Sequence, residues 1–197
     1  AWTFPSKHEK EYMEQVDENM KSLLKSLHMP CGVANISFFY RDGKFYVFET
    51  GFRLGGGHSF DYQRASGGID YLAAMIKHAL GEEYIPNMNL DQDRGYAVTY
   101  NVYFKANEGD VVQEVIGEDK IKEMNEVVTY QPFLYKGYSV KSDKPAKITM
   151  LTLYAKDLDV ILSRIETINS ILSVRTDKGE CKIFAGLTSS EVLSAIQ

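Results

Sequence analysis

The chain has 197 residues and a net charge of −5, which argues against sequence-independent binding of nucleic acid, because such binding needs a basic surface. No apolar run approaches the roughly 20 residues that cross a bilayer, and no signal peptide opens the chain. We therefore expect a soluble protein without nucleic-acid or membrane partners, long enough to fold around its own core.

The two cysteines, Cys31 and Cys181, form neither a CxxC pair nor a Cys/His metal-ligand spacing. We expect both to be buried thiols in a reducing compartment, which indicates the cytoplasm. The chain opens on Ala1 without an initiator methionine, as expected of a cut or engineered start.

The first predicted element is a helix from about residue 6 to residue 27. Ser6 and Glu9 have the spacing of a capping box, and Pro30 ends the helical pattern. Between them, apolar residues recur at steps of three and four: Met13, Val16, Met20, Leu23, Leu24 and Leu27.

A β-hairpin follows, because residues 32–40 and 45–48 are rich in β-branched and aromatic residues and flank Asp42-Gly43. The next segment, residues 49–58, holds four glycines within seven positions. Such a loop lets the backbone approach another group closely.

A second helix is predicted from about residue 68 to residue 80, with Asp70 expected to cap it or to pair locally near its start and with Gly81 as its C-terminal glycine cap. Residues 82–94 are polar, contain Pro86 and are expected to form a linker. We therefore place a domain boundary there and expect one domain over residues 1–88 and another over residues 89–197.

The second domain alternates further strands and helices. Strands are expected at residues 96–105, 111–116, 127–131 and 148–155, and helices at 118–124, 157–172 and 189–196. This pattern predicts an α+β fold with mostly antiparallel strands.

The common catalytic signatures are absent, including a phosphate-binding loop with lysine, His-Glu-x-x-His, Gly-x-Ser-x-Gly and zinc spacings. What remains is Glu49 and Arg53, followed directly by Gly55, Gly56 and Gly57. A carboxylate at a strand end can hold Mg²⁺ against phosphates, an arginine can stabilise developing negative charge, and glycine N–H groups can approach an anion. A Glu49–Arg53 ion pair that merely closes the loop is the structural alternative.

Several segments in order carry a resemblance to a known family. Residues 32–36, 42–49, 53–57 and 66–70, with the helices on either side, resemble the second subdomain of the ATP-grasp ligases. Residues 94–185 more faintly resemble the C-terminal domain that follows this module in amino-acid ligases and biotin carboxylases, through residues 135–138 and 159–164. The resemblance implies a second ATP-grasp subdomain followed by a small α+β domain.

By resemblance, Glu49 is a Mg²⁺ ligand and Arg53 stabilises the acyl-phosphate or adduct stage. Asn35 stands where many members have an acidic metal ligand and still offers an amide oxygen, whereas Gly51 replaces an asparagine and offers no side chain. Gly55, Gly56, Gly57 and His58 are the candidates for binding phosphate or substrate. A local structural role for His58 is the alternative.

Biotin-carboxylase-type members carry glutamine and a glutamate base two and four positions after the arginine, where this chain has Gly55 and Gly57. The resemblance therefore implies a carboxylate–amine ligase rather than a biotin carboxylase. ATP and Mg²⁺ are the implied cofactors, and a small-molecule carboxylate and an amine are the implied substrates.

Two functions remain open. In the first, the chain is the C-terminal part of a ligase that activates a carboxylate as an acyl phosphate and joins it to an amine or similar nucleophile. The phosphate-holding lysines would then belong to a missing N-terminal ATP-grasp half, and this chain alone is expected to be inactive. In the second, a degraded ATP-grasp fold binds a nucleotide or metabolite without catalysis. The residues Asn35 and Gly51, which replace side chains that many family members have, favour this second function.

Overall fold

The structure is a computed structural model, and it describes residues 1–29, 31–83 and 94–197. The chain divides into two compact units, one of Ser6–Leu90 and one of Ala1–Pro5 with Asp91–Gln197. Most of the predicted linker, residues 82–94, lies outside the described residues. Both units combine helices with antiparallel strands, which confirms the predicted α+β class.

The unit Ser6–Leu90 begins with two helices, α1 (Glu9–Gln15) and α2 (Asp17–Ser26), where the sequence predicted one. The helix breaks at Val16, although the apolar periodicity continues through this residue. The predicted capping box is also absent. His8 is the N-cap of α1, and the Oγ atom of Ser6 accepts from the His8 N–H at 3.2 Å instead.

The predicted hairpin is present, as β2 (Asn35–Arg41) and β3 (Lys44–Gly51). Its two-residue turn is Asp42-Gly43, and both residues have positive φ, 52° and 74°, as a type I′ turn requires. One face of the hairpin packs on α1, where the Tyr12 ring contacts Phe38 and Phe45 at centroid distances of 5.3 and 5.8 Å.

Two more helices complete this unit, α3 (Ser59–Gly67) and α4 (Tyr71–Ala79). The Asp70 carboxylate caps α4 by accepting from the Ala73 N–H at 2.9 Å, and Gly81 follows the helix with φ of 76°. Both features were predicted. Helix α3 was not, because its residues show no apolar stripe.

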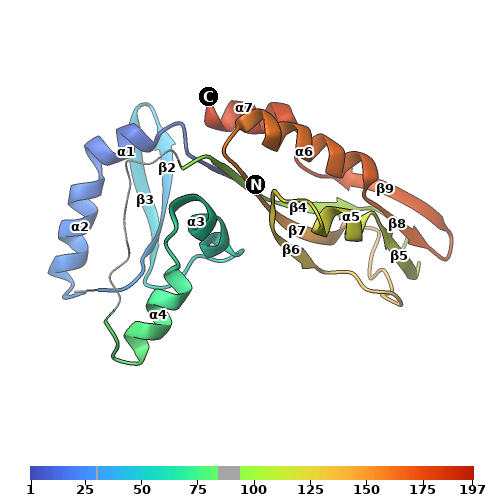
Figure 1. Ribbon diagram of the computed structural model, residues 1–197, viewed down its shortest axis with the longest axis horizontal. Coiled ribbons are helices and arrows are strands. Elements are labelled where there is room, and N and C mark those ends of the chain that lie inside the picture. Colours follow the sequence, from blue (N-terminus) through green and yellow to red (C-terminus); the bar gives the residue numbers. More distant parts are fainter. Residues whose placement is uncertain (30, 84–93) are drawn as a thin grey trace. The chain divides into compact units, whose positions relative to one another are not determined.

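The other unit is a seven-stranded antiparallel sheet with three helices among its described residues. Its strands run in the order β5-β8-β9-β4-β7-β6, with β1 also paired to β4. Two helices lie along the sheet in Figure 1, α6 and α7. The elements are β1 (Trp2–Phe4), β4 (Tyr96–Phe104), β5 (Val112–Ile116), α5 (Glu118–Lys122), β6 (Val127–Pro132), β7 (Ala146–Ala155), α6 (Leu158–Ile171), β8 (Ser173–Thr176), β9 (Gly179–Ala185) and α7 (Ser189–Ile196).

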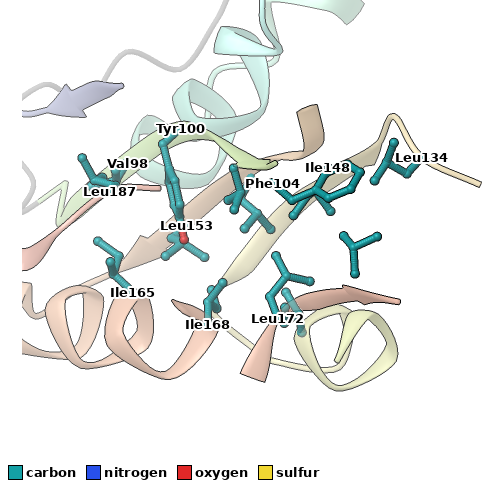
Figure 2. Packing of buried hydrophobic residues seen from close by; sticks show 14 of the residues in the cluster. Val98, Tyr100, Phe104, Leu134, Ile148, Leu153, Ile165, Ile168, Leu172 and Leu187 are labelled. Atoms are coloured by element: carbon teal, nitrogen blue, oxygen red, sulfur yellow. The ribbon is translucent and has the colours of Figure 1, made fainter. Parts of the chain in front are cut away.

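The core of this unit lies between the sheet and α6. Val98, Tyr100 and Phe104 project from β4 towards Ile165 and Ile168 of α6 (Figure 2), and all five are 0–2% exposed. No helix in the described part of the chain is long and apolar enough to cross a membrane.

Candidate functional site

The candidate site is built on the hairpin face that turns away from α1, here called the open face. Residues paired across an antiparallel ladder share a face, so the register assigns side chains to it. The open face comprises Asn35, Ser37, Phe39, Arg41, Lys44, Tyr46, Phe48 and Glu49.

Glu49 reaches the open face because β3 contains a bulge. The pairs from Arg41–Lys44 to Phe38–Val47 are regular, but Ser37 then pairs with Glu49, which leaves Phe48 as the extra residue. Without the bulge, Glu49 would lie opposite Ile36 on the face that packs on α1. A bulge of this kind re-aims side chains, often beside a functional site.

The open face offers oxygen atoms that suit Mg²⁺. Glu49 is exposed and lies directly opposite Ser37, while Asn35 is half-buried and lies opposite Gly51, two pairs further along. Among the described residues, no group of three His, Cys, Asp or Glu side chains is placed to hold a metal. One carboxylate with a hydroxyl and an amide oxygen nearby still fits Mg²⁺, which usually keeps several waters and binds through one or two carboxylates and phosphates.

The glycine loop is anchored to this strand end. A Cβ atom on Gly55 would lie 2.5 Å from Nδ2 of Asn35 and 2.7 Å from Oγ of Ser59, so a side chain there would displace both groups. The loop therefore brings its backbone against Asn35. By contrast, a Cβ on the exposed Gly56 would meet no atom within 4 Å.

Arg53 lies at the start of this loop with an exposed side chain. Its Nη1 donates to the Leu54 carbonyl at 2.9 Å, and its N–H donates to the Gly51 carbonyl at 3.0 Å. Its side chain also passes Gly51, where an added Cβ would be 3.6 Å from Cγ and Nε. These contacts hold the guanidinium group beside the strand end that carries Glu49.

His58 is the N-cap residue of α3 and has a left-handed φ of 57°, after Gly57 at 68°. Its Nδ1 lies 3.1 Å from Oδ2 of Asp61, one helical turn on. The ring thus interacts with the first turn of α3. This is the local structural role that the sequence analysis gave as the alternative to phosphate or substrate binding.

An aromatic surface lies next to Glu49 on the open face, and the sequence analysis did not select it. Phe39 and Phe48 stack with centroids 4.4 Å apart, and they remain 63% and 56% exposed. Ser37 was also missed. The signal that identifies all three is the strand register with its bulge, which the sequence does not show.

The structure is similar to solved ligase structures over most of its length. It matches phosphoribosylglycinamide synthetase from Anaerococcus prevotii with a TM-score of 0.70 and 14% identity, covering 87% of this chain and 44% of that one. For a biotin carboxylase from Campylobacter jejuni, the TM-score is 0.63 at 18% identity, covering 98% and 41%. For an L-amino acid ligase from Bacillus licheniformis, it is 0.62 at 18% identity, covering 87% and 43%. The chain has the fold of ATP-grasp ligases.

The ATP-grasp likeness is one of fold. No protein-family model matches the sequence, and no curated protein matches it either. The chain spans less than half the length of the ATP-grasp structures named above.

Proposed function

We propose that this chain is the C-terminal part of an ATP-dependent ligase that activates a carboxylate as an acyl phosphate and joins it to an amine or similar nucleophile. Residues 1–88 would contribute the second ATP-grasp subdomain and residues 89–197 the domain that follows it. The carboxylate oxygen attacks the terminal phosphorus of ATP, ADP leaves, and the amine then displaces phosphate from the carbonyl carbon. The rest of the nucleotide site would come from an N-terminal half outside this chain.

The observation that carries this proposal is the open face of the hairpin, where Glu49 and the aromatic pair share one side. The exposed stack of Phe39 and Phe48 offers a flat apolar surface that suits a nucleobase, since aromatic groups prefer offset stacking. Glu49 lies at the adjoining strand end, where Mg²⁺ and phosphates would follow. Consistent with this reading, one matched structure is described as a complex with a β,γ-ATP compound and another with MgADP and bicarbonate.

Each residue of the site takes a defined role in the proposal. Glu49 would hold the metal directly, with Asn35 and Ser37 as further oxygen ligands on the same face. Mg²⁺ would neutralise phosphate charge during transfer. Arg53 stabilises the negative charge that develops on the phosphoryl group or on the carbonyl oxygen, and Gly55, Gly56 and Gly57 let the backbone approach an anion.

A non-catalytic nucleotide- or metabolite-binding module is the second candidate. It is favoured by Gly51, which lies opposite Asn35 and offers no side-chain oxygen at the strand end. Such a module would keep the aromatic surface and would lose only turnover.

Product analysis of the full-length parent distinguishes the two candidates. The parent is incubated with ATP, Mg²⁺ and pools of small carboxylates, with hydroxylamine added to trap an acyl phosphate as a hydroxamate. A ligase gives ADP and hydroxamate only when its carboxylate is present, whereas a binding module gives neither. Binding of a nucleotide analogue without any carboxylate-dependent ADP formation would contradict the ligase proposal.

A further inference from the structure

A separate pocket lies in the unit Ser6–Leu90. Its volume is about 820 Å³, and it lies between the segment before β2, the residue after β3, and α4 with its flanks. Most of its lining is apolar, with side chains of Val33, Phe52, Ile69, Ala74, Met75 and Ala79. Pockets of this size and character bind small apolar or aromatic molecules.

Two reactive side chains meet at the wall of this pocket. The Cys31 sulfur lies 3.7 Å from both ring nitrogens of His78, across 47 positions of sequence. Both residues are exposed, which contradicts the buried thiol expected at Cys31. A thiol beside an imidazole can transfer its proton to the ring and so become nucleophilic.

We propose that Cys31 and His78 form a thiol-modification site, and that the pocket selects apolar, uncharged or cationic disulfides as its reagents. His78 accepts the Cys31 proton, and the thiolate attacks one sulfur of the bound disulfide. The disulfide S–S bond breaks, a new S–S bond to Cys31 forms, and the other half leaves as a thiolate that takes up a proton. The exchange needs no other oxidant, because the small disulfide is itself reduced.

The charge preference follows from the rim of the pocket. Glu82 and Glu83 are exposed and line its edge. No lysine or arginine is among the described lining residues. Two carboxylates repel an anionic reagent and leave a neutral aromatic one unaffected.

Modification at Cys31 would also reach the candidate site. Gly32 packs so closely on the Phe52 ring that even a methyl group there would overlap it, and Phe52 directly precedes Arg53. Cys31 and Phe52 line the same pocket, so a group attached to Cys31 would crowd the Phe52 ring next to Arg53. This consequence for activity rests on the proposed function, whereas the modification itself does not.

The test compares two chromogenic disulfides on the 197-residue chain, the neutral 4,4′-dithiodipyridine and the dianionic 5,5′-dithiobis(2-nitrobenzoate). Each rate is divided by the rate of the same reagent with free cysteine. Cys181→Ser isolates Cys31, and Cys31→Ser isolates Cys181. Burial raises the pKa of the Cys181 thiol, with Asp110 adding to the effect, so Cys181 serves as the slow internal reference.

We expect Cys31 to react faster than Cys181 and to prefer the neutral reagent after normalisation. His78→Ala should slow the reaction of the Cys31 thiol by about tenfold or more. Added imidazole should restore part of that rate, as expected when a proton acceptor has been lost. Ile76→Ala, on the same helix but outside the pocket lining, should leave the rate unchanged. Glu82→Gln with Glu83→Gln should remove the preference for the neutral reagent.

Equal normalised rates for the two thiols, or a His78→Ala rate that matches the parent, would overturn the proposal. These outcomes concern only thiol chemistry and do not depend on ATP turnover. If the modified thiol forms as expected while ATP turnover of the full-length parent is unaffected, the modification site stands and only the link to Arg53 fails.

Discussion

Glu49 lies directly opposite Ser37, whereas a hairpin closed by the same two-residue turn without a bulge would place Glu49 opposite Ile36. The extra residue, Phe48, moves the carboxylate from the face that packs on α1 to the open face. The candidate metal ligand and the aromatic surface thus depend on a single inserted residue.

Under the proposed function, Glu49→Gln in the full-length parent should weaken Mg²⁺-dependent ATP turnover, because a neutral amide replaces the carboxylate proposed to hold the cation. We expect apparent magnesium affinity to fall by about tenfold or more, measured as activity over a magnesium titration. Asp42→Asn is the matched control, since it removes one charge at the far end of the same hairpin. An identical magnesium dependence for Glu49→Gln and the parent would remove Glu49 from the metal site.

Arg53→Ala should act on the chemical step, because a cation that faces developing charge lowers the barrier more than it tightens substrate binding. We expect kcat of the parent to fall by about 10²–10³, with a modest change in the KM for ATP. Steady-state kinetics measure both constants. Arg41→Ala, at the turn end of the hairpin, controls for loss of positive charge. A change limited to KM would make Arg53 a binding residue.

Ile165→Ala should destabilise the unit that contains α6, because Ile165 is fully buried against β4. A large-to-small change in such a core costs about 2–5 kcal/mol of unfolding free energy, which denaturant titration of this chain can measure. Val160→Ala, on the same helix and 37% exposed, should cost much less. Equal losses for the two variants would contradict the packing shown in Figure 2.

The Glu126–Arg164 pair should contribute to stability in a pH-dependent way. Arg164 Nη2 donates to Glu126 Oε1 at 3.0 Å, and Nε lies 3.0 Å from Oε2, so the hydrogen bond from Arg164 lowers the pKa of Glu126. A carboxyl whose folded pKa is lowered stabilises the fold above its unfolded pKa, about 4.3, and loses that contribution as pH falls through the folded value.

Glu126→Gln should therefore reduce the unfolding free energy by about 1 kcal/mol at pH 7, since the pair is only partly buried. The difference from the parent should shrink towards pH 3. Denaturant titrations at several pH values give the comparison, with the exposed Glu114→Gln as a control. A difference that stays constant with pH would show that the charge of Glu126 does not contribute.

Periodicity and turn chemistry predicted much of the fold. The hairpin turn at Asp42-Gly43, the cap at Asp70 and the helices of the second half all follow from local signals, and the structure has them. Helix α3 lacks an apolar stripe and β8 has only four residues, so neither left a local pattern to detect. Strand β9, which pairs with β8 across a turn at Asp177-Lys178, was also missed.

The site was less accessible to sequence reasoning, because its geometry depends on contacts between distant segments. Glu49, Asn35 and the glycine loop could be selected as candidates, but their arrangement depends on the bulge and on the contact of Gly55 with Asn35 and Ser59. The Cys31–His78 pair joins segments 47 positions apart. Local patterns carry no information on such a contact.

The chain by itself should bind ATP weakly and should not hydrolyse it. Under the proposed function, its described residues offer one side of a nucleotide site, the open face with Glu49 and the Phe39–Phe48 stack. The matched ATP-grasp structures are more than twice as long as their region of similarity. Under the proposed function, the main positive partners of the phosphates lie outside this chain, so binding loses charge-assisted hydrogen bonds. Isothermal titration of the 197-residue chain with ATP and Mg²⁺ should give millimolar or undetectable affinity. A micromolar Kd, equivalent to about −8 kcal/mol, would mean that a whole nucleotide site lies within these residues and that the proposed division of the ligase is wrong.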